Sequence, residues 1–123
     1  MFDLLTRYNS YIGREYASAL ISAGVQFSMI TFGDDPDRDE FEEGRCGGYW
    51  KPAAMNKLAK FVTVYRYSST NDPEFFRYLA GRHSMYGIQG GIEAIVGKEI
   101  IDEYPHGIVS FHPGDLPMYR GCM

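Results

Sequence analysis

The residues best suited to chemistry lie in one run near the end of the sequence, Ser110 to Gly121, which reads SFHPGDLPMYRG. This run contains one imidazole, His112, together with a carboxylate and a guanidinium, and it directly follows the apolar segment Gly107-Ile108-Val109. That segment is typical of a buried strand, which places His112 at the carboxyl end of a strand, where open α/β sheets bind ligands. A histidine there titrates near neutral pH and can accept and donate protons. The simpler alternative is a histidine whose ring is satisfied by backbone groups.

Two other short runs could contact a ligand. Asn9 and Ser10 follow the first apolar segment at a predicted helix start, where N–H groups and the helix dipole favour an anion. A plain N-cap explains the same pattern. The run Gly87-Ile88-Gln89-Gly90-Gly91 follows a predicted strand and opens a helix, so it could cradle a phosphate. It lacks the Gly-x-Gly-x-x-Gly spacing of a dinucleotide site, and glycines at a helix entry are the alternative.

Apolar periodicity divides the chain into alternating strands and helices. Strands are predicted at residues 2–6, 25–32, 61–65, 84–88 and 107–109, and helices at 12–23, 51–60, 73–80 and 92–103. Asn71 or Asp72 can cap the third helix, and Gly24 and Gly81 stand where the first and third helices end. Residues 33–49 show neither period and are predicted to form a long loop. This alternation is typical of right-handed βαβ units. We therefore expect one α/β domain over residues 1–123, a three-layer Rossmann-like fold with an open, mostly parallel sheet and helices on both faces.

Composition and charge exclude several other classes of protein. The chain has 123 residues, 45% of them hydrophobic, and a formal net charge of −4, so it lacks the strongly basic balance of a nucleic-acid-binding domain. Its two cysteines, Cys46 and Cys122, form no Cys-x-x-Cys pair and have no histidines at metal spacing. This pattern predicts no metal site and a reducing, cytoplasmic location. The sequence shows no signal peptide and no run of eighteen apolar residues, so we expect no membrane association.

The run from His112 to Gly121 resembles the His-x-x-Leu-Leu-Pro-x-x-Arg-Gly signature of the formyltransferases that use 10-formyltetrahydrofolate. The segment before it, Val96 to Pro105, is similar to the helix that precedes the catalytic strand in that family. The family pairs its histidine with an asparagine two residues earlier, where this chain has Ser110. A third catalytic residue of the family, an aspartate, falls beyond position 123. The resemblance thus implies the amino-terminal part of a formyltransferase fold, incomplete and without the carboxyl-terminal strands.

The resemblance also implies roles for individual residues. His112 would move protons and contact the oxyanion, with Ser110 beside it as a second catalytic candidate. The donor 10-formyltetrahydrofolate would bind along the backbone from residue 88 to residue 95. For the acceptor, the candidate contacts are Arg120 and, from their place at a predicted helix start, Asn9 and Ser10. Arg120 has the alternative of a solvated turn residue. The donor-binding positions are Ile88, Gln89, Gly90, Gly91, Ile92 and Ile95.

The expected function is transfer of a formyl group from 10-formyltetrahydrofolate to a primary amine. The acceptor stays open between an amino sugar nucleotide, an aminoacyl-tRNA and a small amine, and low basicity disfavours tRNA because phosphate contacts need cations. The absent aspartate and Ser110 predict negligible turnover by residues 1–123 alone. The alternative is a non-catalytic binding or assembly module that keeps the sheet. In either case an exposed sheet edge could pair with a second copy of the chain.

Overall fold

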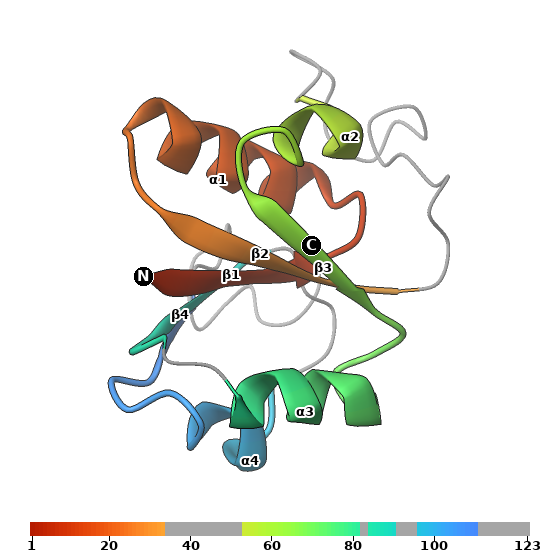
Figure 1. Cartoon of the computed structure of the whole chain (residues 1–123), viewed down its shortest axis with the longest axis vertical. Helices are drawn as coiled ribbons and strands as arrows, with labels where there is room; N and C mark the ends of the chain where they lie inside the picture. The colour runs from red at the N-terminus through yellow and green to blue at the C-terminus, as the bar shows by residue number, and fades with distance from the viewer. Residues whose placement is uncertain (34–52, 82–83, 91–95, 111–123) are drawn as a thin grey trace, which may run out of the picture.

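The computed structural model describes residues 1–33, 53–81, 84–90 and 96–110 (Figure 1). Within these residues, five strands alternate with four helices. In order they are β1 (Phe2–Arg7), α1 (Tyr11–Ser22), β2 (Phe27–Phe32), α2 (Met55–Leu58), β3 (Thr63–Tyr67), α3 (Pro73–Ala80), β4 (Gly87–Gln89), α4 (Lys98–Ile101) and β5 (Ile108–Ser110).

All five strands are parallel and lie in the order β3-β2-β1-β4-β5. The strand order reverses beside β1, since β2 and β3 extend to one side of it and β4 and β5 to the other. Leu5, near the end of β1, pairs with Ile30 on β2 and with Gln89 on β4. This topology confirms the predicted Rossmann-like α/β fold and places its switch point between β1 and β4.

Two apolar layers cover the two faces of the sheet, with α1 and α2 on one face and α3 and α4 on the other (Figure 1). Successive residues of a strand point to opposite faces, so Leu4 belongs to the first layer and Leu5 to the second. The first layer buries Phe2, Leu4, Ala17, Phe27, Met29, Met55 and Leu58. The second buries Leu5, Ile30, Phe32, Phe75, Leu79, Val96, Ile100 and Tyr104.

Several predicted boundaries are wrong. The helix predicted at 51–60 has only four described helical residues, Met55–Leu58, because Ala54 is extended. The following strand begins at Thr63 and not at Phe61, whose side chain is 65% exposed and whose N–H donates to the Leu58 carbonyl at 2.9 Å in a turn.

The last helix and strand also differ from the prediction. Of the helix predicted at 92–103, residues 92–95 lie outside the described part, and the described remainder is helical over Lys98–Ile101, since Gly97 is extended. The strand predicted as buried is the edge strand β5, where Val109 is 49% exposed. An apolar run alone does not distinguish an edge strand from a central one.

Helix α3 begins with Pro73 as the sequence predicts, and its N-cap is Asp72, one of the two caps that the sequence left open. The Asp72 carboxylate accepts hydrogen bonds from the N–H groups of Ser68 and Glu74, both at 2.9 Å, and these bonds lower the pKa of Asp72. A carboxyl group whose pKa is lower in the folded than in the unfolded state stabilises the fold at pH values above its unfolded-state pKa. This stabilisation is lost as the pH falls through the folded-state pKa.

We therefore expect the free energy of unfolding to fall as the pH drops from 6 to 2.5, and to fall less in the variant Asp72→Asn. Urea denaturation at a series of pH values measures both curves. Two parallel curves would show that this carboxylate does not couple the stability of α3 to pH.

Candidate active site

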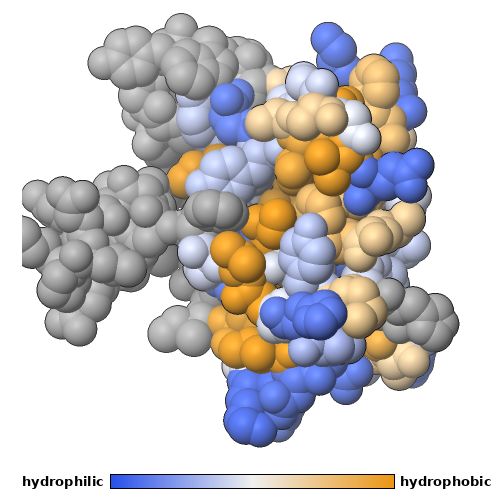
Figure 2. All heavy atoms as spheres, turned by 90° about the vertical axis from the view of Figure 1, so that its left-hand side faces the viewer, coloured by the Kyte–Doolittle hydropathy of each residue, from blue (hydrophilic) through white to orange (hydrophobic). Residues whose placement is uncertain are grey.

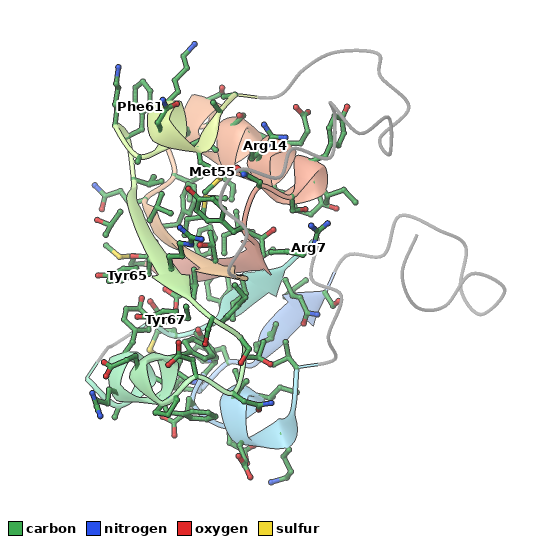
Figure 3. All side chains as sticks on the ribbon, turned by 90° about the vertical axis from the view of Figure 1, so that its right-hand side faces the viewer. Arg7, Arg14, Met55, Phe61, Tyr65 and Tyr67 are labelled. Carbon is green, nitrogen blue, oxygen red and sulfur yellow. The ribbon has the colours of Figure 1, made fainter. Side chains whose placement is uncertain are left out.

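The described candidate residues lie together at the carboxyl ends of three neighbouring strands. Asn9 and Ser10 follow β1, Gln89 ends β4, and Ser110 ends β5. Ser110 pairs directly with Gln89 in the sheet register. Figure 3 faces this end of the sheet and shows Arg7 where β1 ends. Five candidates, namely Gly91, Ile92, Ile95, His112 and Arg120, lie outside the described residues.

The turn between β1 and α1 is held in a specific conformation. Asn9 has a φ of 62°, a left-handed conformation that asparagine tolerates better than most residues. Ser10 is buried, and its hydroxyl accepts the Gly13 N–H at 3.2 Å. The structure thus makes Ser10 the N-cap of α1, the alternative that the sequence left open, while contact of Ser10 with an acceptor stays a prediction.

Glycine at position 13 lets α1 approach the central strand. A Cβ added to Gly13 would lie 1.9 Å from the Thr6 Oγ1 of β1. Both residues are buried, so no side chain could be accommodated there without moving the helix. Close contact between the first turn of the helix and β1 therefore fixes the position of Asn9 and Ser10 relative to the strand ends.

Gly90 plays a similar part at the end of β4. Its N–H donates to the Leu5 carbonyl at 3.1 Å, and a Cβ added to it would lie 2.3 Å from the Tyr16 ring of α1. Burial raises the pKa of Tyr16, so this phenol stays neutral near pH 7. Because Gly90 has no side chain, the backbone can pass between β1 and α1 at the switch point of the sheet.

The sequence analysis missed three arginines around this end of the sheet. Arg14 of α1 is buried, and Arg7 is half-buried at the end of β1 (Figure 3). The guanidinium carbon of Arg66 lies 4.4 Å from the centroid of the Tyr8 ring, in a cation–π contact. Arg14 lies between Gly13 and Ala17 on the buried stripe of α1, and this position could have predicted its burial. The spacing of apolar residues alone does not indicate it.

The described residues contain no group of three His, Cys, Asp or Glu side chains that could hold a metal ion. Within the same part of the chain, no helix combines the length and the apolar character needed to cross a membrane. The described side chains at the candidate active site offer hydroxyl, amide and guanidinium groups, and His112 lies two residues beyond Ser110 in the sequence.

Comparison with known proteins finds one relative to report. The chain is similar to a methionyl-tRNA formyltransferase. That relative comes from Chloroflexus aggregans (strain MD-66 / DSM 9485) and is 26% identical over 103 residues. The match covers 84% of this chain but 32% of the relative, so the chain spans about a third of the length of the curated relative. No family model matches the chain. The similarity supports a formyltransferase-like family and leaves the acceptor open.

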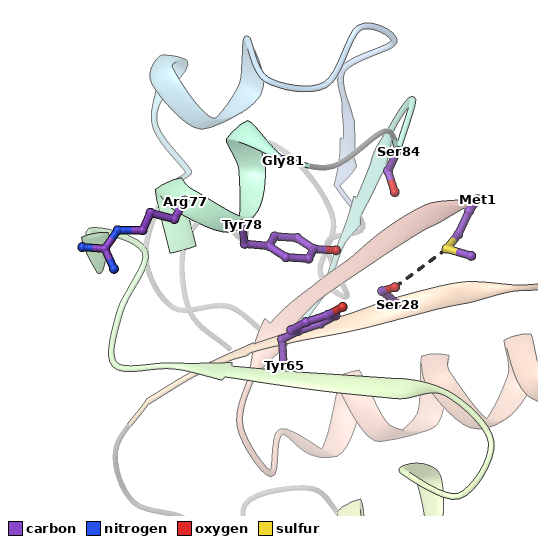
Figure 4. Close-up of a pocket in the computed structure, with 7 residues that line it drawn as sticks. All are labelled: Met1, Ser28, Tyr65, Arg77, Tyr78, Gly81 and Ser84. Atoms are coloured by element: carbon purple, nitrogen blue, oxygen red, sulfur yellow. Dashed lines mark hydrogen bonds between the residues drawn. The ribbon is translucent and has the colours of Figure 1, made fainter. Parts of the chain in front are cut away.

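A hollow lies near the opposite end of the strands, between the sheet and α3 (Figure 4). It has a volume of about 570 Å³, and the described residues that line it are Met1, Ser28, Tyr65, Arg77, Tyr78, Gly81 and Ser84. The hydroxyls of Tyr78 and Ser84 donate to the buried Asp3 carboxylate at 3.1 and 3.3 Å. Burial raises the pKa of Tyr78 to about 12. Since two of the lining hydroxyls, those of Tyr78 and Ser84, bond Asp3, we assign this hollow a structural role and place the chemistry at the carboxyl ends.

Proposed function

We propose that this chain binds 10-formyltetrahydrofolate at the carboxyl ends of β1, β4 and β5 and transfers its formyl group to a primary amine. The observation that carries the proposal is the meeting of the separate candidate segments at the switch point of a parallel sheet. Open α/β sheets bind their ligands in this place. The similarity to a methionyl-tRNA formyltransferase, which extends over 84% of the chain, supports the same reaction class.

In the proposed reaction the nitrogen of the amine attacks the formyl carbon on N10 of the folate. The carbonyl oxygen becomes an oxyanion, the bond from carbon to N10 then breaks, a proton leaves the amine, and a proton reaches N10. We assign both proton transfers to His112 and a hydrogen bond to the oxyanion to Ser110, which ends β5 and is exposed. A serine hydroxyl rotates and reaches less far than an amide, which is one of the two reasons to expect negligible turnover by residues 1–123 alone.

The donor pocket follows from the backbone of β4. This strand pairs with β1 on one side and with β5 on the other, so the backbone N–H and C=O groups of Ile88 and Gln89 are used in the hydrogen bonds of the sheet. The Gly90 N–H is bonded to the Leu5 carbonyl, so we propose that the Gly90 carbonyl and the backbone groups that follow it contact the edge of the pterin ring. The side chains of Ile88 and Gln89, both half-buried, would contribute to the wall of the pocket.

Two of the arginines indicate which chemical group the acceptor carries. Arg7 and Arg66 lie at the carboxyl-end half of the sheet, and Arg66 is exposed over the Tyr8 ring. Guanidinium groups match phosphate oxygens well, and the start of α1 adds the positive end of a helix dipole. We propose that the acceptor amine carries a phosphate group, as an amino sugar nucleotide or an aminoacyl-tRNA does.

Titration of the ¹⁵N-labelled chain with 5-formyltetrahydrofolate tests the donor site by NMR. We expect saturable shifts of the amide signals of Gln89, Gly90 and Ser110. Removal of one hydrogen bond in His112→Ala should weaken binding about fivefold. Lys98→Ala, an exposed change on α4, is the matched control and should leave binding unchanged. Shifts confined to Ser28, Tyr65 and Tyr78 would place the ligand in the hollow beside α3 and contradict the proposal.

A second candidate function is a non-catalytic module that keeps the formyltransferase sheet. The observation that favours it is Ser110, which stands at the strand end where the resembled motif has an asparagine. Folate binding without any release of tetrahydrofolate, even with Asn at position 110, would support this second function.

A further inference from the structure

Large apolar side chains gather at the end of the sheet opposite the candidate active site. An exposed apolar side chain precedes each of the strands β1 to β4. In chain order these are Met1 (72% exposed), Val25, Phe61 (65%), and Met85 with Tyr86. Because the strands are parallel, these residues all lie where the strands begin. Figure 2 faces this end of the molecule and shows apolar spheres in the middle of the surface, with hydrophilic groups above and below. Single exposed apolar residues are ordinary, but a group of them marks an interaction surface.

Opposite charges flank this apolar surface. Lys60 lies between α2 and β3, at one end of the row of strands, and Glu103 lies between α4 and β5, at the other end. Both side chains are exposed, and neither forms an ion pair with another described residue. Lys57 adds a second cation on the α2 side, whereas Asp102 on the α4 side is paired with Lys98 at 2.8 Å. Among the described residues, the unpaired charges of this surface are therefore positive at one end and negative at the other.

We propose that this surface binds a second copy of the chain in a two-fold symmetric dimer. A two-fold axis that lies in the interface, perpendicular to the line from Lys60 to Glu103, brings Lys60 of each copy opposite Glu103 of the other. The strand order has β1 at its centre, so the same axis brings Val25, before β2, opposite Met85 and Tyr86, before β4. Apolar groups then meet apolar groups and cations meet anions, which is the self-complementarity that an isologous interface requires.

This arrangement differs from the pairing through a sheet edge that the sequence suggested. The edges β3 and β5 stay free in the dimer, and the candidate active site of each copy faces outward at the opposite end of its sheet. The proposal does not depend on the proposed formyl transfer, because no residue of the dimer surface belongs to that site.

Sedimentation equilibrium over a range of chain concentrations measures the oligomeric state. We expect a monomer–dimer equilibrium that weakens as salt is added, since salt screens the exposed ion pairs. Met85→Asp introduces a charge into the apolar centre twice per dimer and should raise the dimer dissociation constant about 100-fold. Met85 is 44% exposed, so the variant should keep its circular dichroism spectrum and its fold.

A charge exchange gives the sharper test. Lys60→Glu alone and Glu103→Lys alone should each weaken the dimer about tenfold, and the variant that carries both changes should return within about threefold of the original. Glu15→Lys, in the first half of α1 and away from this surface, is the control and should leave the dimer intact. A monomer at every concentration, an open-ended series of larger species, or a double variant as weak as the single ones would overturn the proposal.

Discussion

Replacement of Ser110 by asparagine is expected to raise the rate of the proposed formyl transfer about 100-fold, because an oxyanion-hole donor contributes about 10²–10³ in rate. Ser110 ends the edge strand β5, is exposed, and pairs with Gln89 on β4, so a longer amide at this position points from the same strand end toward the same edge of the sheet. The amide also has a fixed N–H geometry, whereas a serine hydroxyl rotates and can bond the backbone instead.

Release of tetrahydrofolate from 10-formyltetrahydrofolate, with water or an added primary amine as acceptor, measures this rate without knowledge of the natural acceptor. Ser110→Ala is the matched control and should be no faster than the original chain. His112→Ala in the Ser110→Asn background should abolish the gain, because the proton transfers assigned to His112 would be lost. Equal rates for the alanine and asparagine variants would contradict the role that we assign to position 110.

The sequence predicted the elements whose signals are local. The first two strands are runs of branched and aromatic residues, and α3 has its capping aspartate, its proline and its following glycine in the expected order. Gly24 also has the left-handed φ expected after α1. The helices α2 and α4 could not be bounded in this way. Each has four residues, about one turn, so periodicity cannot define its ends, and local turn hydrogen bonds set them.

The candidate site likewise has one part that local sequence patterns predicted and one part that they did not. The placement of Asn9, Ser10, Gln89 and Ser110 at one end of the sheet followed from the alternation of strands and helices alone. The contact of Arg66 with the Tyr8 ring did not, because it joins β3 to the end of β1 across the intervening β2. A pattern within one element predicts which end of a strand a residue occupies. It does not predict which distant side chain lies against it.

Asp3 is the strongest case of such a distant interaction. It lies near the start of the central strand, is fully buried, and accepts hydrogen bonds from three hydroxyls that are 75 to 101 residues away in the sequence. Tyr78 belongs to α3, Ser84 precedes β4, and Tyr104 follows α4, with its hydroxyl 2.7 Å from Asp3 Oδ2. One carboxylate thus connects β1 to three separate segments on one face of the sheet.

Replacement of Asp3 by alanine should therefore lower the free energy of unfolding by about 4 kcal/mol, since each buried hydroxyl left without its acceptor costs about 1–3 kcal/mol and partial relaxation recovers some of the loss. Tyr104→Phe removes one of the three bonds and should cost about 1.5 kcal/mol. Thr63→Ala, an exposed change on the edge strand β3, is the control and should stay within about 0.5 kcal/mol of the original. Urea denaturation gives all three values.

In the variant with both Asp3→Ala and Tyr104→Phe, the two losses should not add, because Tyr104 no longer has this carboxylate to bond. Fully additive losses would show that the two groups act independently and that the hydroxyls, rather than the carboxylate that joins them, hold this face of the sheet.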